Sequence, residues 1–107
     1  MRRVVLFSIA AFSAAGVAGA SAALDFSTEA DETGDVFAYS VEQRYAAPIS
    51  IAAAVADLRA AGMTCSEGAA PTCSKVVSAN DCTYTFVVTV TGTAERAVVR
   101  GSTRLGC

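Results

Sequence analysis

The chain has 107 residues, a formal net charge of −2, four cysteines and no histidine. This length suits a single small domain, and the slightly acidic charge argues against nucleic acid or an anionic membrane surface as a partner. Histidine is the side chain that most often moves protons at neutral pH and most often binds transition metals. Composition therefore favours a non-catalytic protein without a metal or a cofactor.

The first 22 residues have the pattern of a signal peptide. Two arginines precede an uncharged, mostly apolar run at 4–17, and an Ala-Ser-Ala triplet at 20–22 offers the small residues that signal peptidase recognises. The run is too short for a membrane anchor, which needs roughly 20 strongly apolar residues. We expect cleavage after Ala22, or alternatively after Ala20. The protein is then exported, periplasmic or extracellular, with no membrane insertion after cleavage.

The mature chain begins with an acidic stretch. Residues 23–107 carry ten acidic side chains and six basic ones, because two of the eight basic residues lie in the signal peptide, so their formal charge is −4. Half of these acids fall in residues 23–35, which contain no base and only Leu24 and Phe26 as large apolar residues. The spacing of the acids does not match a calcium-binding loop. This composition predicts a flexible acidic lead, followed by one domain over residues 36–107.

Residues 36–45 are predicted to form a strand. Phe37, Tyr39 and Val41 alternate with small and polar residues, and Tyr45 has the same parity. An alternation with a period of two is typical of a half-buried strand.

A helix is predicted after Pro48. Apolar residues follow at intervals of three and four, the spacing that buries one helix face: Ile51, Val55 and Leu58. Pro48 or Ser50 opens this helix and Gly62 ends it. Its outward face is mostly alanine, which we interpret as a choice of good helix formers rather than as a docking surface.

Extended segments are predicted in the rest of the chain, at 63–65, 73–77, 82–91 and 94–105. Residues 82–91 alternate most clearly, with cysteine, aromatic and valine side chains on one face and mainly threonines on the other. Threonine is common on exposed strand faces, so this row predicts no ligand site. The sequence Ser-Ala-Asn-Asp at 78–81 predicts a hairpin turn.

The predicted order is strand, helix, then three strands, which gives an α+β fold with one helix packed on a small antiparallel sheet. Over residues 36–107 this order is similar to that of cystatin-like domains, which also carry disulfides toward the C-terminus. The hairpin motif of cystatins, Gln-x-Val-x-Gly, does not occur, and the corresponding turn at 78–81 has a different sequence. The similarity is therefore one of topology.

The four cysteines are predicted to form two disulfides. Structural zinc usually takes cysteines in pairs separated by two to four residues, and the cysteines here are more widely spaced. An even number of cysteines in a small exported domain is typical of a disulfide framework. Of the three possible pairings we predict Cys65–Cys73, which closes a loop with a glycine and a proline, and Cys82–Cys107, which joins two neighbouring strands.

No catalytic group is predicted. Lys75, the sole lysine, adjoins Ser74, but neighbouring residues of a strand point to opposite faces and do not form a nucleophilic couple. The carboxylates of the predicted domain are scattered along the sequence. We therefore expect that the protein is not an enzyme.

A row of arginines is the best candidate for a binding surface. Arg96, Arg100 and Arg104 follow one another at intervals of four, an even number, so they would lie on one side of the last strand. One interpretation is a docking stripe for carboxylates or phosphates, which suits the forked donors of arginine. The other is protection of an edge strand against aggregation.

The sequence thus predicts a small exported, disulfide-stabilised, non-catalytic binding or accessory domain. The alternative is an inhibitor of a secreted hydrolase that presents a rigid loop, either 66–72 or the turn at 78–81. An envelope or extracellular protein is the kind of partner that such a domain would meet. The ligand itself does not follow from the sequence.

Overall fold

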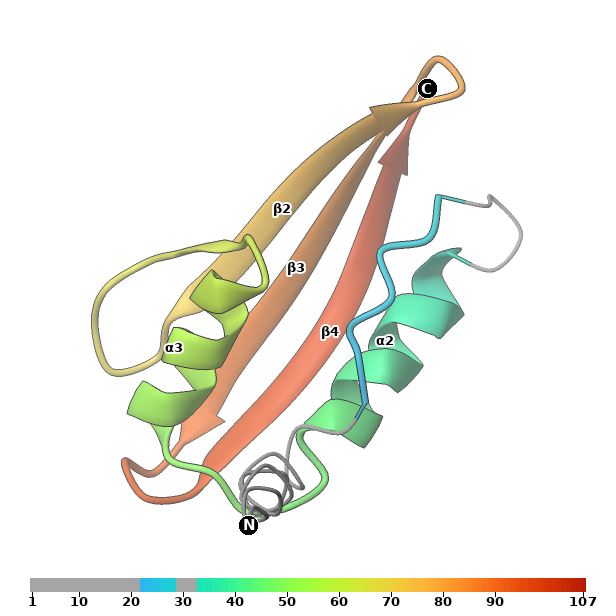
Figure 1. Ribbon diagram of the computed structural model, residues 1–107. Coiled ribbons are helices and arrows are strands. Elements are labelled where there is room, and N and C mark those ends of the chain that lie inside the picture. Colours follow the sequence, from blue (N-terminus) through green and yellow to red (C-terminus); the bar gives the residue numbers. More distant parts are fainter. Residues whose placement is uncertain (1–21, 29–32) are drawn as a thin grey trace, which may run out of the picture.

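The computed structural model describes residues 22–28 and 33–107, and within them it contains two helices and one four-stranded sheet (Figure 1). In chain order these elements are α2 (Thr33–Arg44), α3 (Ile51–Ala60), β1 (Thr64–Cys65), β2 (Thr72–Ala79), β3 (Cys82–Gly92) and β4 (Ala97–Gly106). Each strand pairs antiparallel with the next, so the sheet order is β1-β2-β3-β4. The predicted α+β class and antiparallel sheet are confirmed.

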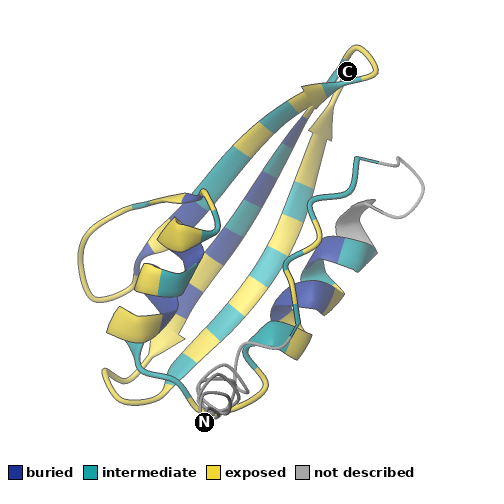
Figure 2. Ribbon diagram, in the orientation of Figure 1, coloured by how far each residue is buried: buried dark blue, intermediate teal, exposed yellow. Residues whose placement is uncertain are grey.

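Both helices pack against the same face of the sheet. Burial alternates along β3, where every second side chain is buried (Figure 2): Tyr84, Phe86, Val88 and Val90. These residues share one hydrophobic cluster with Phe37 and Val41 of α2 and with Ala54 and Leu58 of α3. The core is therefore a single layer between the helices and one side of the sheet, which we call the core face.

The first predicted element is wrong, because residues 36–45 belong largely to helix α2 and not to a strand. Phe37 and Val41 are four residues apart, so they share a face in a helix as they do in a strand. Tyr39 distinguishes the two, and its exposed fraction of 64% agrees with the helix. The domain therefore has two helices on its sheet, and the strand-first order that resembled cystatin-like domains is not present.

The turns and caps follow local sequence chemistry. Ser50 caps α3 by accepting a hydrogen bond from the Ala53 amide, which makes Ser50 rather than Pro48 the start of this helix. Gly62 follows the helix with a φ of 95°, as predicted. Asn80 and Asp81 both have positive φ, of 56° and 65°, which suits the tight turn between β2 and β3.

The segment at 22–28 is extended and lies beside α2 (Figure 1). Leu24 and Phe26 pack against the core, and the Phe26 ring contacts the rings of Phe37 and Phe86 at centroid distances of 5.3 and 5.1 Å. This packing corrects the prediction of a flexible lead for these residues. The predicted signal peptide lies almost entirely outside the described residues and stays a prediction.

Helix α2 comes close to β4 because Gly101 has no side chain. A Cβ atom at this position would lie 2.6 Å from Cγ2 of Val41 and 3.1 Å from Cε2 of Phe37. Any larger residue at 101 would push α2 away from the sheet. Gly101 therefore sets the distance between the two elements.

We predict that Gly101→Ala lowers the free energy of unfolding by about 1–3 kcal/mol, the usual cost of overpacking a core. Gly106→Ala is the matched control in the same strand, because its Cβ would meet only the Thr83 carbonyl oxygen, at 4.0 Å. Urea denaturation of both variants measures the difference. Equal stability of the two variants would show that α2 does not pack on Gly101.

Candidate functional site

Two disulfides join the predicted pairs of cysteines. Cys65 and Cys73 lie opposite each other in β1 and β2, with a Cα–Cα distance of 3.9 Å. Cys82 and Cys107 join the start of β3 to the end of the chain, with a Cα–Cα distance of 4.1 Å. The predicted pairing is confirmed, and no described cysteine is free.

The β3–β4 register follows from where the hairpin turns. The predicted strands at 82–91 and 94–105 imply a turn near Gly92, which would place Cys82 opposite residues near 103 and 104. The turn instead spans residues 93–96, where Thr93 and Arg96 exchange backbone hydrogen bonds of 3.1 Å. Gly92 therefore pairs with Ala97 and Thr83 with Gly106, which brings Cys107 opposite Cys82.

In the structure Arg96 is separated from the other two arginines of the predicted row, Arg100 and Arg104. All three arginines are exposed, but Arg96 lies in the turn before β4 begins at Ala97. Arg100 and Arg104 lie within β4, opposite Thr89 and Thr85 of β3. Their Cα atoms are about 13 Å apart at roughly 3.3 Å per residue. None of the three forms an ion pair within the described part of the chain.

Arg100 and Arg104 belong to the sheet face turned away from both helices, which we call the outer face. The register places the other side chains of this face on all four strands: Thr64, Thr72, Ser74, Val76, Ser78, Thr83, Thr85, Val87, Thr89, Thr91, Val98 and Ser102. Its described side chains include no carboxylate, and the nearest acids in sequence, Asp81 and Glu95, lie in the two hairpin turns. The outer face is therefore a hydroxyl-rich surface with positive charge only.

Ser74 and Lys75 lie on opposite faces of β2, as expected. Ser74 pairs with Val87 on the outer face, whereas Lys75 pairs with Phe86 on the core face. The Lys75 ammonium lies 4.4 Å from the centroid of the Phe26 ring, a cation–π contact. Lys75 thus helps to hold the N-terminal segment on the sheet.

A groove with a volume of about 530 Å³ lies between α3 and the loop at 66–69. Its helix side is lined by Ile51, Ala52, Val55, Ala56 and Arg59, and Gly92 and Ala94 complete the lining beside the loop. The alanine face that we interpreted as helix-favouring thus faces a loop across an open space. Sequence alone did not indicate this groove, since no periodicity in the sequence determines how the loop lies relative to α3.

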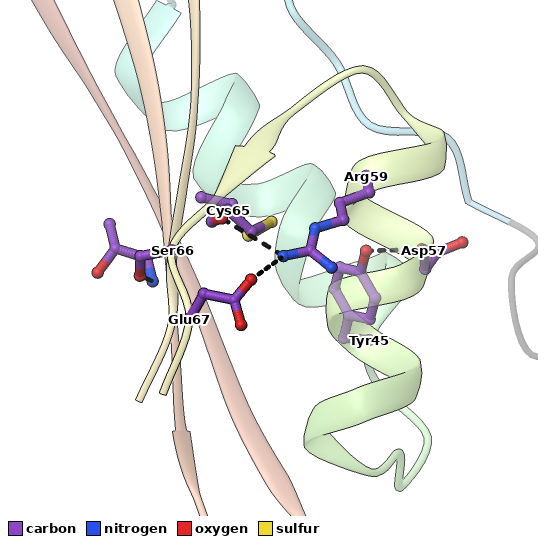
Figure 3. Close-up of a disulfide and its surroundings, with 8 residues drawn as sticks. Tyr45, Asp57, Arg59, Cys65, Ser66 and Glu67 are labelled. Atoms are coloured by element: carbon purple, nitrogen blue, oxygen red, sulfur yellow. Dashed lines mark hydrogen bonds and ion pairs between the residues drawn. A yellow bond between two sulfur atoms is a disulfide. The ribbon is translucent and has the colours of Figure 1, made fainter. Parts of the chain in front are cut away.

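Arg59 and Glu67 face each other across this groove (Figure 3). Nη2 of Arg59 lies 3.9 Å from Oε2 of Glu67 and 3.4 Å from the Cys65 carbonyl oxygen. Both distances are long for charge-assisted hydrogen bonds, which are usually about 2.7–2.9 Å. The two side chains are half or more exposed, so this ion pair is weak.

A second group of polar side chains joins the two helices. Arg44 of α2 donates from Nε and Nη2 to the two carboxylate oxygens of Asp57 in α3, at 2.7 and 2.8 Å. The Tyr45 hydroxyl donates to the same carboxylate at 2.6 Å, and Nη1 of Arg44 donates to the Ala22 carbonyl oxygen at 2.6 Å. This cluster joins α2 to α3. Its contact with Ala22 also holds the N-terminal segment in a chain that keeps this residue, as after cleavage at Ala20, whereas cleavage after Ala22 removes it.

The cluster shifts the pKa of each member. Hydrogen bonds from Arg44 and Tyr45 hold the pKa of Asp57 below its ordinary value of 3.8. Burial and the hydrogen bond to Asp57 raise the pKa of Tyr45 well above its usual value. The hydrogen bond to Asp57 also raises the pKa of Arg44. The three groups form a structural network in which the carboxylate stays charged.

Among the described residues, no group of three or more histidine, cysteine, aspartate or glutamate side chains is placed to hold a metal ion. Within the same residues, neither helix has the length and apolar character needed to cross a membrane. Comparison of the chain with family models, curated proteins and solved structures finds no match.

We predict that Asp57→Asn lowers the free energy of unfolding at pH 7 by about 1.5–3 kcal/mol, the range for hydrogen bonds to a charged group. The folded pKa of Asp57 is below the unfolded one, so its contribution is present above pH 4 and is lost as pH falls through the folded pKa. The difference between wild type and variant should therefore shrink below pH 4.

Chemical denaturation of both proteins between pH 7 and pH 2 measures this difference. Glu42→Gln, at an exposed position of α2, is the control and should behave like wild type. A gap between wild type and Asp57→Asn that stays constant over the whole range would contradict the role of the charged carboxylate.

Proposed function

We propose that the protein is an exported, non-catalytic binding domain whose outer face docks on an acidic surface of an envelope or extracellular protein. The observation that carries this proposal is the placement of Arg100 and Arg104 on an open sheet face whose described side chains include no acid. The two disulfides are consistent with an oxidising compartment. Export is part of the proposal.

The chemistry of the outer face favours a protein partner. Valine side chains and threonine methyl groups lie between the hydroxyls, and Val76 and Val98 have exposed fractions of 61% and 45%. Protein interfaces combine apolar contacts with polar groups in this way and are enriched in arginine. Nucleic acid is disfavoured because residues 23–107 carry ten acids against six bases, a formal charge of −4.

A second copy of the chain suits this face poorly. Two outer faces packed together would bring Arg100 and Arg104 of each copy into one interface, with no carboxylate on either described face to pair with them. Like charges at a desolvated interface are costly. A partner that supplies carboxylates avoids this cost and engages both guanidinium groups.

We predict that replacing both Arg100 and Arg104 with serine abolishes capture of the partner from envelope or culture extract and leaves the fold unchanged. Wild type should release the captured protein as salt is raised, because salt screens the charge pairs. Arg59→Ser is the matched control, an arginine outside the outer face, and should capture normally. Mass spectrometry identifies the captured protein, which should have an acidic surface patch.

The other interpretation, edge protection, gives a different result in the same experiment. β4 is the last strand of the sheet, so its arginines also discourage pairing with other sheets. If that is their role, the double variant aggregates during gel filtration and its monomeric fraction still captures the partner. This outcome would contradict the docking proposal.

Inhibition of a secreted hydrolase is the second candidate. The loop at 66–72 is closed by Cys65–Cys73 and by a 2.9 Å hydrogen bond from the Ser66 amide to the Thr72 carbonyl oxygen. Residues 66–70 are all exposed, so the loop is constrained and accessible at once. Capture of a hydrolase that is lost in Glu67→Ala and kept in the double arginine variant would favour this candidate.

A further inference from the structure

The groove between α3 and the loop at 66–69 is distinct from the outer face. Its volume of about 530 Å³ lies within the range of pockets that hold small organic ligands. Most of the lining is apolar or has no side chain beyond Cβ, and its polar side chains are Arg59 on the helix and Ser66 and Glu67 on the loop. Such a lining favours a ligand that is mostly hydrocarbon.

The two sides of the groove are held apart by different interactions. Helix α3 is anchored through Ala54 and Leu58, which are fully buried in the core. The loop is held at its base by Cys65–Cys73 and by the hydrogen bond between Ser66 and Thr72. Because the two anchors are independent, the groove is open before any ligand arrives, which lowers the entropic cost of binding.

Arg59, a cationic side chain in the lining of the groove, makes only long polar contacts. The guanidinium of Arg44 makes three hydrogen bonds of 2.6–2.8 Å, two of them to Asp57. The guanidinium of Arg59, in contrast, has only contacts of 3.4 and 3.9 Å in the described part of the chain, both through Nη2. Its other donors are available to an anion that enters the groove.

We propose that this groove binds a small carboxylic acid with an alkyl chain, whose carboxylate takes the place of Glu67 on Arg59. The alkyl chain lies against Ala52, Val55 and Ala56, and the carboxylate accepts two parallel hydrogen bonds from the guanidinium. The ligand carboxylate can displace Glu67 from Arg59 at low cost, because the Glu67 side chain is 96% exposed and makes only the long contact to Arg59. This site is independent of the docking proposed for the outer face.

The charges at the groove decide between ligand classes. A neutral alcohol with the same chain would leave the Arg59 donors unused, so the carboxylate should bind more tightly. An alkyl ammonium would meet the Arg59 charge and is disfavoured. Glu67 competes for Arg59, so its removal should strengthen the binding of a carboxylate.

Isothermal titration calorimetry with sodium decanoate, below its micelle concentration, tests the proposal on the disulfide-bonded protein. We expect one saturable site, binding at least about tenfold weaker in Arg59→Gln, and equal or tighter binding in Glu67→Gln. Ala56→Leu fills the groove from an exposed position of α3 and should abolish binding. Ala60→Leu, exposed on the same helix outside the groove lining, should bind as wild type does.

Thermal melts of the variants establish that each is folded before titration. The proposal is overturned if decanoate does not saturate, if Ala56→Leu still binds it, if Arg59→Gln binds it unchanged, or if 1-decanol binds as tightly. Replacement of Arg100 and Arg104 with serine should leave decanoate binding intact. A failure of the groove and a failure of the outer-face docking are therefore separate results.

Discussion

The whole of the described apolar packing in this domain lies on one side of a single sheet. Gly101 is central to this arrangement, because it lets Phe37 and Val41 of α2 rest directly on β4. Phe26 then contacts both Phe37 and Phe86, so the N-terminal segment joins the same layer. A core built on one face leaves the other face of the sheet to water or to a partner.

A one-sided core of this size supplies little stability by itself, and the two disulfides compensate for it. They close loops with sequence separations of 8 and 25 residues. Loop-closure entropy assigns about 2.6 kcal/mol to the shorter loop and about 3.5 kcal/mol to the longer one. The Arg44–Tyr45–Asp57 cluster adds a polar connection between the helices where the apolar layer ends. Because the disulfides and the polar cluster supply part of the stability, the groove and the outer face do not need large apolar residues.

The two candidate surfaces differ in chemistry. The outer face is open, rich in hydroxyl groups and positively charged, which suits a broad contact with another macromolecule. The groove beside α3 is concave and apolar with one weakly held arginine, which suits a small amphiphile. The disulfide Cys65–Cys73 closes the loop beside the groove, whereas Cys82–Cys107 joins the start of β3 to the C-terminus.

The hairpins could be predicted from sequence because strict alternation and turn residues act locally. β3 and its buried face, the Asn80-Asp81 turn and both disulfides followed from such signals. Helix α2 did not, since Phe37 and Val41 are spaced in a way that fits a strand and a helix equally. The exposure of Tyr39 distinguishes the two structures, and it is visible only in the folded protein.

The candidate sites depend more strongly on tertiary structure. Nothing local in the sequence indicates that Arg44 and Tyr45 will meet Asp57, because they lie on different elements. Arg96 was grouped with Arg100 and Arg104 by parity, but the four-residue turn at 93–96 separates it from the strand. The groove depends on the path of a loop, and no periodicity in the sequence encodes that path.

Both proposed surfaces require that one face of the sheet is buried and the other is open to solvent. Paramagnetic broadening of methyl NMR signals by a water-soluble gadolinium chelate measures this difference. The methyl groups of Thr85 and Thr89 on the outer face should be broadened strongly, while those of Val88 and Val90 on the core face stay sharp. Equal protection of the threonine and valine methyl groups in the isolated protein would show that the two faces of the sheet do not differ in burial.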